Sequence, residues 1–360
     1  MQLNPSLVTT LYQPTVDRVD NILSANSEWI RRYHDYIDDL NIRISPLINA
    51  ANLRFGTAKN LDIYLPLSMA EAATKSSARF DIRFGGQSVA TLIVRKVEVK
   101  ILFKTGHNSA YFDGYGTFPC NNKKSIGKSA QTTLGSLLTK DEFYWNSHEA
   151  VAFRKFFAQY QVGNLRSLEH NFESQLLKQF SMTTSVGKLL CNIQPVKLLG
   201  KRFQMPTPIH ANEARKGIVN YANASGGGID ILARCGSGRR TSLTVFELKD
   251  ECNANEKPEV AIAQAIAYAT FVRQLLRSSN TNAEKWWSFF GFSRPLTSSD
   301  LGIKAVIAMP VGKYNDTSFA KIKLQLPKTA PYNDDHIELH YMYFNVSNSN
   351  KITGISSTSL

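Results

Sequence analysis

Residues 229–249 read IDILARCGSGRRTSLTVFELK, and this stretch predicts two β-strands that fold back on each other through a tight turn. The turn falls at residues 236–239, where GSGR supplies the glycines that hairpin reversals need. In a symmetric hairpin the numbers of paired residues share one sum, so a pairing of 238 with 239 also pairs 230 with 247. The sequence therefore predicts that Asp230 and Glu247 lie opposite each other on neighbouring strands.

The second strand of this hairpin ends with Glu247 and Lys249, two positions apart. Successive side chains of a strand point to opposite faces, so these two side chains share a face with Asp230. Two carboxylates a few ångströms apart repel each other unless a cation lies between them. The pattern therefore favours a divalent metal ion at this position. An acid and a lysine two positions apart on a strand also form ordinary surface ion pairs, and that alternative stays open at this point.

The chain as a whole has the composition of an ordinary soluble protein, with 43% hydrophobic and 20% charged residues over 360 positions. This length suits two domains better than a single core. The net charge of +13 favours an anionic partner, and nucleic acid is the commonest partner of this kind. A generally basic surface without such a partner is the alternative.

The cysteines and the N-terminus bear on the location of the protein. Four cysteines are scattered along the chain without a CxxC pair, which argues against a zinc ribbon and favours a reducing compartment. The N-terminus has no basic start followed by an apolar core, as a signal peptide would. No apolar run reaches the roughly 18 residues that a membrane-spanning helix needs. We therefore expect a cytoplasmic protein that does not enter a membrane.

The first half of the chain changes character twice. Helical spacing of apolar residues covers 15–50, and short β-branched or aromatic runs cover 61–118. Residues 119–140 are polar and carry Lys123, Lys124 and Lys128, so we expect a loop there. These segments together predict an α+β N-terminal domain at 1–160.

The second half predicts a different organisation. After the hairpin, residues 258–278 form a strong helix with proline at its first position, and strand-like segments follow at 303–311 and 337–346. Helices that alternate with strands in this order favour an α/β domain with a mixed sheet, which we place at 161–350. The polar residues 351–360 are expected to fray as a tail.

The chemistry-bearing residues of this half follow a recognisable order. Asp230 comes first, Glu-Leu-Lys at 247–249 lies on the next strand, and the following helix carries Gln264 and Tyr268. This order resembles the PD-(D/E)xK nuclease superfamily, which includes many restriction enzymes, Holliday-junction resolvases and repair nucleases. The resemblance covers residues 165–315, less than half of the chain.

Two details refine this resemblance. The superfamily often has proline before its first acid, whereas this chain has Ile229. Superfamily members also often place a glutamate on the helix before the first core strand, and Glu173 is the best match here, with Glu169 as the runner-up. The resemblance implies a restriction-endonuclease-like mixed sheet flanked by helices and preceded by the N-terminal domain.

The function that the resemblance implies is hydrolysis of phosphodiester bonds, most often in DNA, by a Mg²⁺- or Mn²⁺-dependent endonuclease. The implied catalytic residues are Asp230, Glu247, Lys249 and Gln264. Asp230, Glu247 and Glu173 would hold the metal, which takes oxygen ligands. The metal would polarise the scissile phosphate and lower the pKa of a bound water. Lys249 would orient that water or offset the charge of the transition state.

Contacts with nucleic acid are expected from Arg239 and Arg240 at the tip of the hairpin and from Tyr268 on the helix. Gln264 and Tyr268 lie one turn apart, so both can face the same site. The N-terminal half would supply recognition, partner binding or the contacts of a homodimer. A non-catalytic nucleic-acid-binding protein on a nuclease-like scaffold is the main alternative, and a globular protein with no nucleic-acid role is a third.

Other motifs predict less. The three glycines at 226–228 lack the following Lys-Ser of a phosphate-binding loop, so we interpret them as a sharp turn before Asp230. His336 and His340 share a strand face, but no further ligand accompanies them at zinc spacing. The aromatic cluster at 286–290 could stack on bases, although packing in the core is the favoured interpretation.

Overall fold

The computed structural model describes residues 5–50, 61–65, 77–102, 142–159, 167–182, 190–223, 226–278, 280–296, 300–328 and 334–360. The described α-helices are α1 (Pro5–Ala25), α2 (Glu28–Asp39), α3 (Ser45–Ala50), α5 (His148–Gln159), α6 (Leu168–Phe180), α7 (Pro258–Arg277) and α8 (Asn280–Phe289). Shorter helical turns are η1 (Leu40–Ile44), η3 (Leu190–Asn192), η4 (Ala214–Lys216) and η5 (Gly238–Arg240).

Strands β1 to β5 come from the first half of the chain: β1 (Leu61–Leu65), β2 (Ser77–Phe84), β3 (Gln87–Arg95), β4 (Val99–Leu102) and β5 (Glu142–Tyr144). The following strands are β6 (Ile193–Pro195), β7 (Lys197–Leu198), β8 (Lys201–Phe203), β9 (Met205–Pro206), β10 (Ile209–Glu213), β11 (Ile218–Tyr221), β12 (Gly228–Ile229), β13 (Ile231–Cys235) and β14 (Ser242–Leu248). The last are β15 (Gly302–Pro310), β16 (Lys323–Gln325), β17 (His336–Val346) and β18 (Ile352–Thr358).

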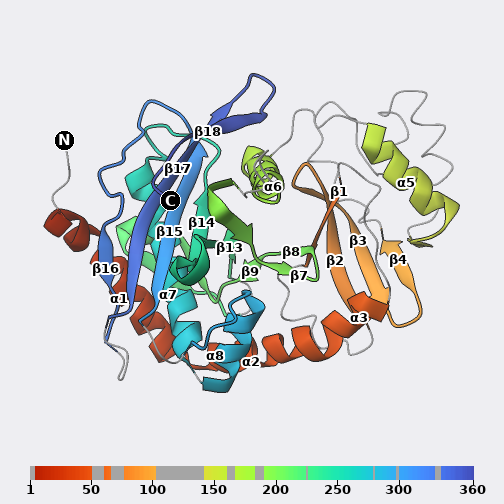
Figure 1. Cartoon of the computed structure of the whole chain (residues 1–360), viewed down its shortest axis with the longest axis horizontal. Helices are drawn as coiled ribbons and strands as arrows, with labels where there is room; N and C mark the ends of the chain where they lie inside the picture. Colours follow the sequence, from red (N-terminus) through yellow and green to blue (C-terminus); the bar gives the residue numbers. More distant parts are fainter. Residues whose placement is uncertain are drawn as a thin grey trace.

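Two lobes make up the described part of the chain, each built around its own sheet (Figure 1). The larger lobe holds a mixed sheet in the order β16-β17-β15-β14-β13-β6, with β18 on the outer side of β17. Strands β14, β15 and β17 run parallel, whereas β13 and β6 are antiparallel to their neighbours. The expected mixed sheet flanked by helices is therefore present in this lobe.

Helices cover both faces of this sheet because the residues of β14 alternate between two cores. Leu243 and Val245 pack in the core that contains α7, and Phe246 and Leu248 pack in the core that contains the apolar side of α6. The connection from β14 to the parallel β15 needs a long crossover, and α7 provides it. Glu247 has the same parity as Val245, so it lies on the α7 face of the sheet.

The sequence explains why α7 forms where it was predicted. Pro258 occupies the first turn, where its missing N–H costs no hydrogen bond, and Glu259 and Arg277 suit the positive and negative ends of the helix dipole. Alanine and branched residues fill most of its length, and most of its side chains are buried. A helix that is apolar nearly all round belongs inside a lobe, between sheet and further helices.

A buried ion network fixes the C-terminal end of α7. Asp335 accepts charged hydrogen bonds from Arg273 (Nε–Oδ2 2.9 Å) and Arg277 (Nη2–Oδ1 2.7 Å), and also accepts one from the backbone N–H of Leu301 at 2.8 Å. All three charged side chains are at most 2% exposed. The many hydrogen bonds hold the pKa of Asp335 below its ordinary value although burial acts against this.

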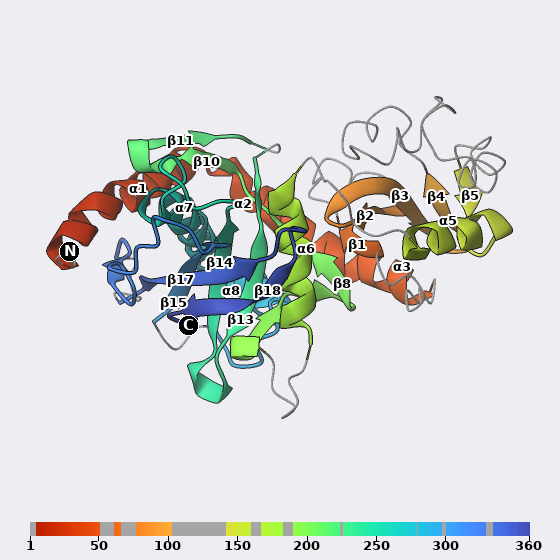
Figure 2. The same cartoon turned by 90° about the horizontal axis from the view of Figure 1, so that it is seen from above.

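The two halves of the sequence are interleaved in space. Helices α1 and α2 leave the first half and pack on α7 and α8, with the rings of Trp29 and Phe271 5.6 Å apart and the Tyr33 hydroxyl donating to the carbonyl of Pro206 at 2.7 Å. In the other direction, β8 pairs in parallel with β1 and carries β7 into the smaller sheet, whose order is β5-β4-β3-β2-β1-β8-β7. Figure 2 shows α6 between the two sheets. A boundary near residue 160 is thus crossed by packed segments on both sides.

One expectation about the C-terminus is wrong. Residues 352–358 do not fray but form β18, which pairs antiparallel with β17. Isoleucine, threonine and serine suit an edge strand, and the exposed edge of β17 offers the hydrogen bonds that the polar composition alone did not predict. The loop expected at 119–140, with its lysines, lies outside the described residues. No helix in the described ranges is long and apolar enough to cross a membrane.

Candidate active site

A cleft of about 880 Å³ opens at the end of the β13–β14 hairpin that is remote from its turn. Its walls come from α6, from β10 and η4, from the segment after β14 and from the first turns of α7. Asp230, Glu247, Lys249 and Gln264 all line it. The hairpin, the helix before it and the helix after it thus bring four sequence-predicted site residues into one cleft.

The register of the hairpin sets the two acids opposite each other. Ile231 pairs with Phe246, so the next pair along is Asp230 and Glu247, as the numbering predicted. Asp230 lies in the bend between β12 and β13, and its Oδ2 accepts a hydrogen bond from the backbone N–H of Leu248 at 2.8 Å. This bond links the two strands where regular pairing ends and orients the Asp230 carboxylate.

Glu247 is the most deeply placed acid of the cleft, with 2% of its surface exposed. Its Oε1 accepts from Lys249 Nζ at 2.8 Å. Its Oε2 is buried and has no hydrogen-bond partner in the part of the chain that the structure describes. Burial raises the pKa of Glu247 to about 7 even though Lys249 acts to lower it. The carboxylate therefore lacks one favourable contact, which a cation would supply.

A chain of polar contacts leads from Lys249 into α7. Lys249 Nζ lies 3.5 Å from Gln264 Oε1, and Gln264 Nε2 donates to the Tyr268 hydroxyl at 3.2 Å. Tyr268 is 2% exposed, so its hydroxyl contacts Gln264 from the buried side. Tyr268 therefore acts on the cleft only through Gln264. A Cβ at Gly227 would lie 3.2 Å from that hydroxyl, which explains the value of glycine just before Asp230.

The acids shift one another's protonation. Burial, followed by the charges of Glu247, Glu169 and Glu173, raises the pKa of Asp230 well above its ordinary value. Burial also raises the pKa of Glu169. For Lys249 burial acts to lower the pKa, but Glu247 and Glu169 outweigh it and raise the pKa, so the ammonium stays protonated. The ion pair thus keeps Lys249 charged. At Glu247 the cost of burying the carboxylate outweighs the ion pair and favours the protonated form.

The two candidate glutamates of α6 have different surroundings. Glu169 lines the cleft, and its Oε2 is 4.0 Å from Lys249 Nζ. Glu173 is 2% exposed, with Oε2 3.9 Å from Arg83 Nη1 of the smaller lobe and 3.6 Å from His170 Nδ1. Its Oε1 is buried without a hydrogen-bond partner in the described ranges. Glu173 therefore faces the junction of the lobes, and Glu169 faces the cleft.

The arginines of the hairpin tip lie away from these residues. Arg239 and Arg240 are exposed on η5, at the beginning of β14, whereas Glu247 is near its end. Seven residues of strand at about 3.3 Å each separate the tip from the cleft by about 20 Å. The structure does not bring these arginines into the cleft.

Sequence reasoning missed the far wall of the cleft. Arg215 and Lys216 on η4, with Asn255 and Glu256 after β14, line it. The strands β10 and β11 of the hairpin that carries η4 are short and their register shifts between His210 and Glu213, so their sequence alone did not mark a wall of the cleft. Gly226 allows this wall to approach, because a Cβ there would lie 1.8 Å from the carbonyl oxygen of Thr207.

The weaker motifs have structural explanations. Trp286 is fully buried and packs against Tyr33, Tyr36 and Phe290, which agrees with the favoured core interpretation. His340 is 3% exposed; its Nδ1 contacts Ser359, and its Nε2 lies 3.2 Å from a Glu338 carboxylate.

The fit of a divalent cation can be judged from charge and from unmet contacts. Five acids and three bases line the cleft, so it is acidic although the chain carries +13. The buried carboxylate oxygen of Glu247 without a partner is a hard donor of the kind Mg²⁺ and Mn²⁺ accept. Within the described residues, however, no three His, Cys, Asp or Glu side chains are already gathered around one ion position. The oxygen donors of the cleft therefore suit a divalent cation. In this structure the Lys249 ammonium occupies the position beside Glu247.

Comparisons with known proteins give no further guide to identity. No family model, no curated protein and no solved structure matches the chain.

Proposed function

We propose that this protein is a metal-dependent nuclease that hydrolyses phosphodiester bonds, with DNA as the favoured substrate, and that its larger lobe is restriction-endonuclease-like. The observation that carries the proposal is the meeting of Asp230, opposite the buried Glu247, with Lys249 and Gln264 in one cleft. An isolated acid and lysine on a strand would be a surface ion pair. Here the pair is largely buried, lies opposite a second acid and contacts Gln264 of α7.

Mg²⁺ or Mn²⁺ is the cofactor that this arrangement suits. Asp230 and Glu247 would hold it, and Glu169 is placed to assist from α6 more directly than Glu173. When bound, such an ion polarises a phosphodiester and lowers the pKa of a water molecule. It also offsets the burial and the neighbouring acidic charges that raise the pKa of Asp230.

Lys249, held in place by its neighbours, would stabilise the transition state. Its ammonium stays protonated at neutral pH because Glu247 and Glu169 raise its pKa. A fixed positive charge in a largely buried position stabilises the extra negative charge of a pentacoordinate phosphate more than a solvated one would. Gln264, held by Tyr268, limits where the ammonium can go. These residues orient and stabilise, and no nucleophilic side chain is required.

Basic residues in the cleft, and others farther along the hairpin, would bind the phosphate backbone of the substrate. Arg215 and Lys216 line the cleft itself, and Arg239 and Arg240 are exposed about 20 Å away along the hairpin. Several base pairs of duplex cover such a span, since each adds 3.4 Å per strand. The net charge of +13 supports the same partner.

A non-catalytic nucleic-acid-binding protein is the second candidate, and one observation favours it. Lys249 already pairs with Glu247 at 2.8 Å, and no three-ligand metal group is preformed among the described residues. In that protein the same side chains would be a buried structural ion pair, and the basic surfaces would account for all of the function.

Cleavage assays separate the two candidates. Purified protein is incubated with supercoiled plasmid, linear duplex, single-stranded DNA and RNA, in Mg²⁺, Mn²⁺ or EDTA. Cleavage is expected with either metal and not with EDTA. Asp230→Asn, Glu247→Gln and Lys249→Met should each lower the rate by about a hundredfold or more, and the triple variant should be hardly slower than the single ones because they act as a unit.

The control is Asp35→Asn, which removes one negative charge from an exposed pair on α2 and should cut at the wild-type rate. Wild-type rates in all three single variants would refute the catalytic assignment. Binding of DNA without cleavage in any metal would establish the second candidate. If the wild-type protein neither binds nor cleaves nucleic acid, the protein has no nucleic-acid role.

A further inference from the structure

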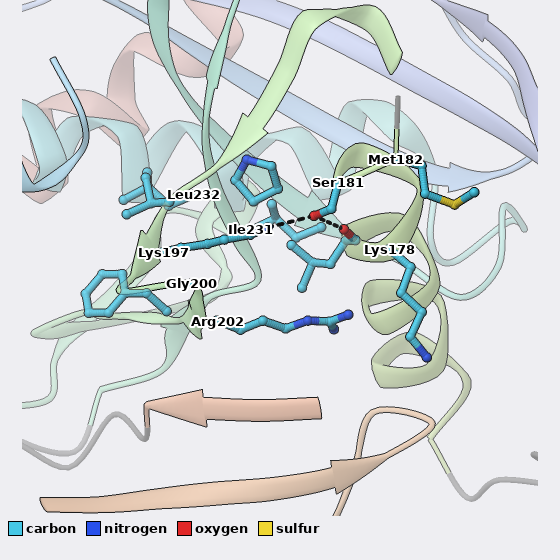
Figure 3. Close-up of a pocket in the computed structure, with 12 residues that line it drawn as sticks. Lys178, Ser181, Met182, Lys197, Gly200, Arg202, Ile231 and Leu232 are labelled. Carbon is cyan, nitrogen blue, oxygen red and sulfur yellow. Dashed lines mark hydrogen bonds between the residues drawn. The ribbon is translucent and has the colours of Figure 1, made fainter. Parts of the chain in front are cut away.

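A second cavity, of about 400 Å³, lies between the C-terminal half of α6 and the strands β6, β7, β8 and β13 (Figure 3). It is formed by the far end of the helix whose N-terminal half faces the active-site cleft. Its size falls within the range of pockets that hold small molecules. None of the residues assigned to cleavage lines it.

Three basic side chains from three elements line this cavity. They are Lys178 of α6, Lys197 of β7 and Arg202 of β8. Figure 3 shows Arg202 extending across the cavity toward Lys178. Asp62 of β1 pairs with two of them, at 3.1 Å from Arg202 and 3.7 Å from Lys178. One carboxylate is thus the ion-pair partner of two cations, and Lys197 is a third cation.

Lys197 has the least compensated charge. Its Nζ donates to the Ser181 hydroxyl at 2.9 Å, and within the described ranges no carboxylate lies at ion-pair distance from it. Burial and the nearby charge of Arg202 lower the pKa of Lys197. An ammonium has three donors, and a hydroxyl satisfies only one of them. Lys197 is exposed, so its other two donors and its charge, unpaired among the described residues, are open to an anion that enters the cavity.

The rest of the cavity wall is apolar. Leu177, Val196, Phe203, Ile231 and Leu232 line it and are all buried. A bare inorganic anion would satisfy the cations but would leave this surface uncovered. A molecule with an anionic head and an apolar body would meet both requirements, because the charge-assisted hydrogen bonds and the apolar contact would form together.

We propose that this cavity is a binding site for a small organic anion, a compact apolar body that carries one carboxylate, sulfonate or phosphate group next to Lys197 and Arg202. The site is separate from the proposed nuclease centre and does not depend on it. The anion would restore the charge balance beside Lys197 and would cover the walls formed by α6 and β13.

The test uses a fluorescent aromatic sulfonate, anilinonaphthalene sulfonate, titrated in EDTA so that the metal site is not involved. Its neutral counterpart, the same molecule without the sulfonate, and inorganic phosphate are the comparison probes. We expect one sulfonate site per chain, binding of the neutral compound weaker by about tenfold or more, and no displacement by millimolar phosphate.

Variants assign the site. Lys197→Met should weaken sulfonate binding by about tenfold to a hundredfold, the loss expected for one charged hydrogen bond, while Lys197→Arg should retain it. The matched control is Lys201→Met, since Lys201 alternates with Arg202 on β8 and does not line the cavity. Lys197→Met should melt no lower than wild type, because Lys197 is exposed and makes no ion pair within the described ranges. Equal binding by Lys197→Met and wild type, or an equal loss in Lys201→Met, would overturn the proposal. Displacement by phosphate alone would overturn the requirement for an apolar body.

Discussion

Replacing Glu247 by glutamine should change how the stability of the protein depends on pH. Burial raises the pKa of Glu247 from 4.5 to about 7 in the folded chain. A carboxyl group with a raised folded pKa favours the folded state while it is protonated. Its contribution is therefore complete below pH 4.5 and is lost as the pH rises through about 7.

The size of this loss follows from the shift. A difference of about 2.5 pKa units corresponds to about 3 kcal/mol of unfolding free energy. The pKa of Asp230 is raised partly by the charge of Glu247, so its titration adds in the same direction. Lys249 stays protonated throughout this window, and the pKa of about 7 already includes its attraction for the Glu247 carboxylate, so the loss of this ion pair adds no separate pH-dependent change.

The measurement is urea unfolding at a series of pH values from 4 to 8, in EDTA. The difference in unfolding free energy between Glu247→Gln and wild type should move in favour of the variant by about 3 kcal/mol across this range. Asp35→Asn controls for the loss of one negative charge. Millimolar Mn²⁺ should restore wild-type stability at pH 8 and leave Glu247→Gln nearly unchanged. A difference that does not vary with pH would refute the claim that Glu247 is buried with an unmet charge.

Three further predictions concern other parts of the molecule. Asp335→Ala should destabilise the fold by about 3–5 kcal/mol in urea unfolding, because it leaves two buried arginines without their acid; a loss below about 1 kcal/mol, as at exposed pairs, would contradict this burial. Gly226→Ala should cost about 1–3 kcal/mol because its Cβ would meet a backbone carbonyl at 1.8 Å, whereas Gly354→Ala, with nothing within 4 Å, should melt like wild type. Duplex binding in Ca²⁺ should weaken with salt, and Arg239→Ala with Arg240→Ala should reduce the slope of log K against log salt by up to about 1.8; an unchanged slope would remove the hairpin tip from the interface.

Local patterns predicted the parts of the fold that depend on local interactions. The register of the β13–β14 hairpin followed from its turn, because antiparallel pairing around a known turn leaves a single register. Helix α7 followed from its proline start and its continuous apolar length. The same two elements position Asp230, Glu247, Lys249 and Gln264, so this part of the candidate site was predictable as a group.

Pairings between distant segments were not predictable in this way. Nothing in residues 197–203 indicates that they extend the sheet of the first half, since that pairing depends on the edge that β1 leaves free. The edge of β17 likewise decides that residues 352–358 form a strand. The position of Glu169 in the cleft, and of Arg239 and Arg240 away from it, depends on the direction in which α6 and the hairpin cross the sheet. Period and composition do not encode these directions.

The packing of α1 against α7 also has a consequence for the order of events during synthesis. The Tyr12 hydroxyl donates to the carbonyl of Glu259, 247 residues later in the chain. At a ribosomal rate of roughly 5–20 residues per second, a period on the order of ten to fifty seconds separates the synthesis of α1 from the synthesis of α7, against which its apolar side packs. Over that period the first helices cannot complete their own core. Helix α1 is therefore made well before α7 and reaches its final surroundings only once α7 has followed it.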